Sequence, residues 1–225
     1  MTKYELKDPL ENGLVSGPMT GVTPEIKELI DSGEIKGEGI EFVENLTYWI
    51  REHFEVPKPY GERPNRLKRT AHEILFPDVD GQGLGKKKRI GTCTEHGKVL
   101  RALLVAKGIP TIWVETIDEE WIAGKYPKGY YSGHIFLEVY VDGGWRVLNT
   151  TAHPRDRETF LLPIEDGYKC SGQIGKVRKI HEYRPVARGL DSRAMWSEDR
   201  KFICLNNKDE WHEFVDVLFP GVSFR

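Results

Sequence analysis

The N-terminal quarter of the chain shows the spacing of apolar residues that is typical of helices. Residues 1–21 are rich in Gly, Pro and Ser, which favours an extended lead-in. Thr23 followed by Pro24 is a good helix start, with a capping hydroxyl and then a proline at the first helical position. Apolar residues at helical spacing predict a second helix over 40–54, and a short helix is expected at 71–75.

The middle of the chain carries the clearest pattern. Apolar residues fall on one face of a helix expected over 92–107. Gly108 stands where a left-handed cap belongs, and Pro110 prevents the helix from continuing. Residues 111–117 alternate and are β-branched, so they should form a strand.

A β-hairpin is expected next. Residues 134–141 are expected to form a strand, Asp142-Gly143 is a hairpin turn signal, and 145–150 should be the returning strand. Farther on, 176–183 can form another strand. The C-terminal segment can form a helix that begins after a capping box at Asn207 and ends before Pro220.

The turn predicts the hairpin register. If Asp142 and Gly143 form a two-residue turn, Asn149 lies opposite Phe136. His134 has the same parity as Phe136, so His134 and Asn149 should share a face as diagonal neighbours. Such pairs are separated by about 7–8 Å or a little less between Cβ atoms, which is within reach of a hydrogen bond.

Composition and charge limit the classes of protein to which the chain can belong. The chain has 225 residues, of which 39% are hydrophobic and 30% charged, enough for a core. We expect a single domain over 1–225, with a core at about 69–153, a helical lead-in over 22–56 and an extension over 154–225. A net charge of −2 argues against nucleic acid or an anionic membrane as partner. Residues 1–10 lack a basic flank before an apolar run, so we expect a cytoplasmic protein.

The three cysteines are too few and too scattered for a disulfide framework. Cys170 and Cys204 are expected to be packed thiols. Cys93 differs, because Thr92 can cap the helix that follows and Glu95 completes a capping box. Cys93 is then the first helical residue, where unpaired backbone N–H groups and the helix dipole favour a thiolate.

Three structural alternatives stay open at this stage. Cys93 can be a small buried residue at a capped helix start, and the basic run 86–89 can be a solvated loop. His134 can be an exposed member of a polar hairpin face that also carries Glu138. Against these stands a recurrent catalytic set of nucleophile, base and orienter, which Cys93, His134 and Asn149 would supply.

Four short motifs occur in a familiar order, each at a helix or strand boundary. They are Gly91-Thr92-Cys93, Gly108-Ile109-Pro110, Gly133-His134 and Trp145-Arg146-Val147-Leu148-Asn149-Thr150-Thr151. Together they resemble the core of the transglutaminase-like superfamily, over roughly Arg69 to His153. The resemblance implies an α+β, papain-like fold in which the helix that carries the cysteine packs on an antiparallel sheet.

The resemblance also implies roles for the site residues. Cys93 would be the nucleophile, His134 the base and then the acid, and Asn149 the orienter, with the Cys93 backbone N–H in the oxyanion hole. The family usually has Asp at the third position, whereas papain-like proteases have Asn. Trp49 and Trp113 are weak candidates for a side-chain oxyanion donor.

Other motifs fail. Residues 81–86 lack the first glycine and the final hydroxyl of a phosphate loop, and 78–81 lack the remaining ligands of an EF-hand. Cys93, His96 and His134 could supply three metal ligands, but no paired ligand motif supports them. No metal and no cofactor is expected. The other histidines are expected to be structural or exposed: His53, His72, His153, His181 and His212.

The function expected from these observations is acyl transfer on amide bonds through a cysteine thioester, with a peptide or protein as substrate. A cysteine peptidase or amide hydrolase is the first reading. A protein-glutamine acyltransferase shares the first half-reaction and differs only in the acceptor. A non-catalytic domain that keeps the fold and binds peptides is the third.

Overall fold

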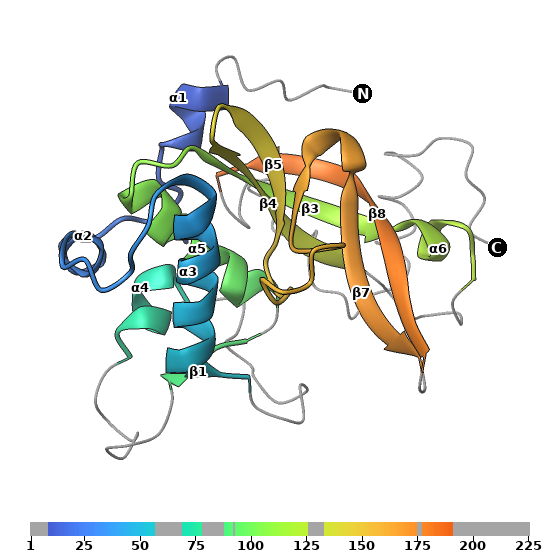
Figure 1. Ribbon diagram of the computed structural model, residues 1–225, viewed down its shortest axis with the longest axis horizontal. Helices are drawn as coiled ribbons and strands as arrows, with labels where there is room; N and C mark the ends of the chain where they lie inside the picture. The colour runs from blue at the N-terminus through green and yellow to red at the C-terminus, as the bar shows by residue number, and fades with distance from the viewer. Residues whose placement is uncertain are drawn as a thin grey trace, which may run out of the picture.

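The computed structural model describes residues 9–56, 69–77, 88–91, 93–125, 133–174 and 177–190. Figure 1 shows helices gathered beside one strongly curled sheet. Within the described ranges, no helix combines the length and the apolar character needed to cross a membrane.

The helices, in chain order, are α1 (Pro9–Gly13), α2 (Pro24–Asp31), α3 (Gly39–His53), α4 (Ala71–Leu75), α5 (Cys93–Ala106) and α6 (Glu119–Ile122). The strands are β1 (Phe54–Glu55), β2 (Lys88–Arg89), β3 (Thr111–Asp118), β4 (Gly133–Val141), β5 (Gly144–Asn149), β6 (Leu161–Pro163), β7 (Tyr168–Ile174) and β8 (Val177–Gly189). The architecture is therefore mixed α and β, as the sequence predicts.

Six antiparallel strands form the main sheet in the order β6-β5-β4-β3-β8-β7. The sheet curls until β7 contacts β5, although these strands are not neighbours in the sheet order. An apolar cluster from four strands fills the inside of the curl (Ile112, Val114, Phe136, Val147 and Tyr168). The sheet is therefore nearly closed around an interior of its own.

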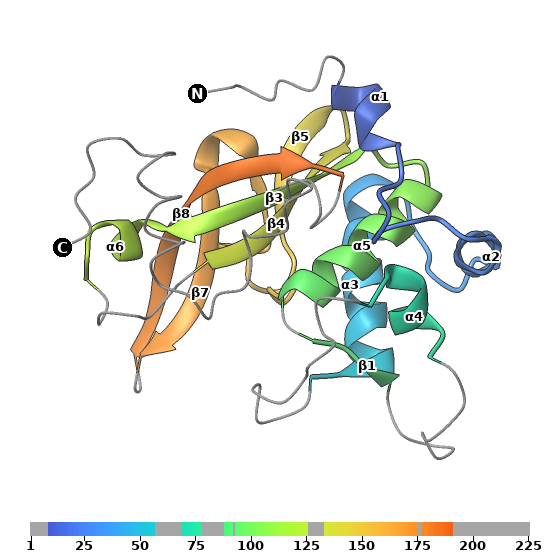
Figure 2. The same cartoon turned by 180° about the vertical axis from the view of Figure 1, so that it is seen from behind.

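Helix α5 packs against the outer face of β3 and β4 and is itself covered by α2, α3 and α4 (Figure 2). Because α5 is surrounded, even its charged residues Lys98 and Arg101 are fully buried. Lys98 donates to the Arg69 carbonyl at 2.8 Å, and Arg101 donates to Thr20 at 2.8 Å. These contacts tie the cysteine-bearing helix to the segments that precede α2 and α4.

The hairpin forms as the sequence predicts. Val141 pairs with Gly144 and Phe136 pairs with Asn149. Asp142 and Gly143 have φ values of 50° and 80°, the left-handed pair that a type I′ turn requires. The register that brings His134 and Asn149 onto one face is confirmed.

Other expectations need correction. The lead-in over 1–21 contains α1, whose Gly13 lies against Pro110 and Thr111, too close for a side chain. The strand expected over 176–183 extends to Gly189, because β3 pairs with it from Tyr183 to Gly189. The helix expected after Asn207 and the cap at Thr92 lie outside the described residues.

Candidate active site

Cys93 opens α5, as expected, and the residue is half-buried. Burial by itself would raise the pKa of this thiol. The charge of His134, a hydrogen bond with the His134 ring, the backbone N–H of Ile135 and the Thr94 side chain together outweigh burial and lower the pKa of Cys93. The surroundings therefore favour the thiolate.

His134 lies at the start of β4, on the face that turns into the curled sheet. Its Nε2 is 2.8 Å from Oδ1 of Asn149 at the end of β5. The ring packs edge-on against Phe136, with centroids 4.8 Å apart. With Nε2 bound to Asn149, the remaining nitrogen, Nδ1, is the one that can exchange a proton with Cys93.

The orientation of the Asn149 amide is decided by its other partners. Nδ2 donates to the Lys169 carbonyl on β7 at 3.1 Å, and Oδ1 accepts from the Thr151 N–H at 3.2 Å. Oδ1 must therefore face His134, so Nε2 of His134 carries a proton. Asn149 is only 1% exposed, which protects this arrangement from exchange with water.

Burial would lower the pKa of His134, but the charge of Cys93 and hydrogen bonds with Cys93 and Asn149 raise it overall. The lowered pKa of Cys93 and the raised pKa of His134 both favour a thiolate beside an imidazolium. Such an ion pair is the reactive form of a nucleophilic cysteine.

Thr150 ties the helix start to the hairpin. Its hydroxyl oxygen lies 2.8 Å from the Ile135 carbonyl and 3.3 Å from the Cys93 carbonyl. The side chain is 1% exposed. One hydroxyl thus spans β4, β5 and the first residue of α5.

A buried carboxylate holds the segment before Cys93. Glu95 is 1% exposed and accepts the N–H of Gly91, beside which no side chain would fit. Arg69 binds the same carboxylate at 2.8 and 2.6 Å. The sequence identified Glu95 as a capping residue, but its ion pair with Arg69, 26 positions away, carries no local signal.

The polar hairpin face proposed as an alternative is wrong. Glu138 is 4% exposed and accepts hydrogen bonds from Tyr168 and from Nε of Arg188, the latter at 2.8 Å. This face points into the curled sheet rather than to solvent. Burial and the Glu138 charge raise the pKa of Tyr168, so the phenol stays protonated as a donor.

Neither tryptophan is placed as an oxyanion donor. Nε1 of Trp49 donates to Glu34 at 2.6 Å, and Nε1 of Trp113 donates to Glu115 at 3.1 Å. The basic run before Cys93 is described only from Lys88, which donates to the Leu75 carbonyl at 2.6 Å. The Lys88 ammonium is therefore engaged with α4.

The suggested metal set of Cys93, His96 and His134 does not form a group of converging ligands in the part of the chain that the structure describes. A different group does form, from Asp118, Glu120 and His181. The sequence pattern predicts a structural or exposed role for His181 and does not single out Asp118. Their separation of 63 positions hides the pairing from any local pattern.

Cys170 gives a useful contrast with Cys93. It lies directly across from His181 in the β7–β8 ladder. Burial, together with the charges of Cys93, Asp156 and Asp118, raises its pKa despite a hydrogen bond with Asn149. Of the two cysteines that the structure describes, only Cys93 has surroundings that favour a thiolate.

Comparison with known proteins adds little. No protein-family model matches the chain, and no curated protein matches it by sequence. By structure it is similar to a protein from Cytophaga hutchinsonii described as a "putative cysteine protease", with 15% identity and a TM-score of 0.46. The match covers 84% of this chain and 56% of that one, so the chain spans little more than half the length of this neighbour. The chemistry of the site is therefore inferred from the geometry of its own residues.

Proposed function

We propose that the protein is a cysteine hydrolase that cleaves peptide or other amide bonds through a thioester on Cys93. The observation that carries the proposal is the connected set of Cys93, His134 and Asn149. In it the pKa of the Cys93 thiol is lowered and that of its imidazole partner is raised, both against the effect of burial.

The first half-reaction breaks the amide. The Cys93 thiolate attacks the carbonyl carbon and forms a tetrahedral oxyanion. The backbone N–H of Cys93, at the first position of α5, has no carbonyl partner within the helix and can stabilise that charge. The C–N bond then breaks, and the His134 imidazolium protonates the leaving amine through Nδ1. A thioester on Cys93 remains.

The second half-reaction releases the acid. A water molecule attacks the thioester while His134, now neutral, accepts a proton from it. The C–S bond breaks and the thiolate returns beside the imidazolium. Throughout, Oδ1 of Asn149 accepts a hydrogen bond from Nε2–H of His134 and keeps the ring in a single tautomer.

Substrate profiling by mass spectrometry tests the proposal. The full chain is incubated with a peptide library and, in parallel, with a glutamine peptide plus a primary amine. Cleavage or ammonia release that disappears in Cys93→Ala is expected. Incorporation of the amine would identify an acyltransferase instead, because an amine rather than water would then resolve the thioester.

A non-catalytic domain would give neither product. In that case Cys93→Ala would also leave binding of any captured peptide unchanged. Cys204→Ala is the matched thiol control and should keep activity. Circular dichroism of each variant separates a lost nucleophile from a lost fold.

A further inference from the structure

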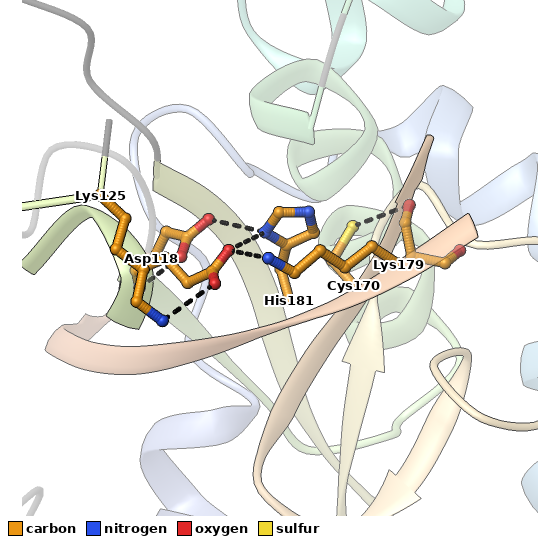
Figure 3. Close-up of polar contacts among 7 residues, drawn as sticks. Asp118, Lys125, Cys170, Lys179 and His181 are labelled. Carbon is orange, nitrogen blue, oxygen red and sulfur yellow. Dashed lines mark hydrogen bonds and ion pairs between the residues drawn. The ribbon is translucent and has the colours of Figure 1, made fainter. Parts of the chain in front are cut away.

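A second polar cluster lies where β3 passes into α6, beside β8. Nδ1 of His181 is 3.1 Å from Oδ2 of Asp118 and 3.7 Å from Oε2 of Glu120. The Asp118 side chain is fully buried and that of His181 is 11% exposed. Figure 3 shows Asp118 and Lys179 reaching toward the same edge of the His181 ring.

We propose that Asp118, Glu120 and His181 form a binding site for a divalent transition-metal ion such as Zn²⁺. Their ligand atoms all lie within 4.8 Å of one another. Ligands at about 2.0–2.2 Å in a tetrahedron around zinc are separated by about 3.3–3.6 Å. The two separations from Nδ1 of His181, 3.1 and 3.7 Å, bracket that range. Because all three ligand atoms lie within 4.8 Å of one another, a metal ion would draw the two carboxylates together.

The carboxylates of the cluster attract positively charged groups. Two carboxylates face one ring nitrogen, which can offer at most one proton. The Lys179 ammonium contacts the same Glu120 oxygen that faces His181, and Lys125 lies 3.3 Å from the other oxygen. The Lys179 ammonium therefore occupies the position that the positive charge of a metal ion would take. Lys179 and the metal ion would compete for Glu120.

The site is accessible from outside. A surface pocket of about 500 Å³ is lined by Glu120, His181 and Lys179, among other residues. Metal can enter from this side, and water can fill the positions that the protein leaves open. Lys179 can swing into the pocket when it is displaced.

The ligand types select the class of metal. One imidazole with two carboxylates suits Zn²⁺ or Mn²⁺. Ca²⁺ prefers six to eight oxygen ligands, which this cluster does not offer. The proposal is independent of the hydrolase function, because none of the three ligands belongs to the set around Cys93.

Calorimetric titration of the full chain with ZnCl₂ tests the site. The protein carries Cys93→Ala, since a thiolate beside an imidazole can itself bind zinc. We expect saturable binding of one ion per chain. His181→Ala and Asp118→Asn should each weaken zinc binding by about 100-fold or more. Loss of a residue that only supports a metal ligand costs about 10–100-fold, and these residues would bind the metal directly.

Two further variants make the test specific. Lys179→Met should tighten zinc binding, because it removes the competing charge. Glu182→Gln, which lines the same pocket without being a ligand, should leave it unchanged. Absence of saturable binding, equal affinity in a folded His181→Ala variant, weaker binding in Lys179→Met, or a preference for Ca²⁺ would each overturn the proposal.

Discussion

The side-chain oxygen of Asn149 lies 2.8 Å from Nε2 of His134, while its nitrogen lies 3.1 Å from the carbonyl oxygen of Lys169. One end of the side chain must accept a hydrogen bond and the other must donate one. An amide meets both demands and a carboxylate meets only the first. The asparagine is thus matched to a site in which β7 closes against β5.

This relationship predicts different defects for two substitutions. Asn149→Asp places a carboxylate oxygen against the Lys169 carbonyl and should lower the free energy of unfolding by about 1–3 kcal/mol. Asn149→Ala frees the His134 ring and should lower kcat by about 100-fold. Urea denaturation and steady-state kinetics check the two effects. An Asn149→Asp variant as stable as the parent would contradict the role given to Lys169.

The paired pKa shifts predict how the reactivity of Cys93 depends on pH. A lowered thiol pKa means that the thiolate, and with it alkylation by iodoacetamide, persists to a lower pH than for an ordinary cysteine. His134→Ala removes the charge and the hydrogen bond that favour the thiolate, so the apparent pKa of Cys93 should rise. Alkylation rates resolved by peptide mass spectrometry measure this.

Cys170 serves as the internal control in the same experiment. Its pKa is raised, so it should be alkylated only at higher pH, whether or not His134 is present. Turnover should show a bell-shaped pH profile. Its acid limb follows deprotonation of the coupled Cys93–His134 pair, and its alkaline limb follows loss of the imidazolium proton.

The Glu95 carboxylate should matter more than a surface ion pair. Glu95→Gln leaves an amide nitrogen facing the Arg69 guanidinium or the Gly91 N–H, and should cost about 2 kcal/mol of stability. Glu44→Gln is the matched control, because its partner Arg157 is 71% exposed and such pairs contribute about 0–1 kcal/mol. Thermal denaturation of both variants compares the two losses of stability. Equal effects would mean that burial of Glu95 adds nothing.

The contact between α5 and the sheet leaves no room at Gly97. An alanine Cβ there would lie 2.8 Å from the Trp113 ring and 3.0 Å from Ile135. Gly97→Ala should cost about 1–3 kcal/mol, because such overpacking shifts the helix against the sheet. Gly144→Ala, whose Cβ would meet nothing within 4 Å, is the control for the added methyl group. Denaturant midpoints compare the two.

The sequence by itself determined the local parts of the site. A two-residue turn at Asp142-Gly143 dictates the strand register, and the register dictates that His134 and Asn149 share a face. The helix start at Cys93 follows equally from nearby residues. These features depend on backbone geometry over a few positions, which local sequence patterns encode.

Only the tertiary structure decided which way that face points and what surrounds it. Closure of the sheet buries Glu138 against Arg188 and brings the Lys169 carbonyl to Asn149. The pairing of β3 with β8 sets His181 beside Asp118. These contacts join strands far apart in the chain, and strand alternation distinguishes two faces without saying which one the sheet will enclose.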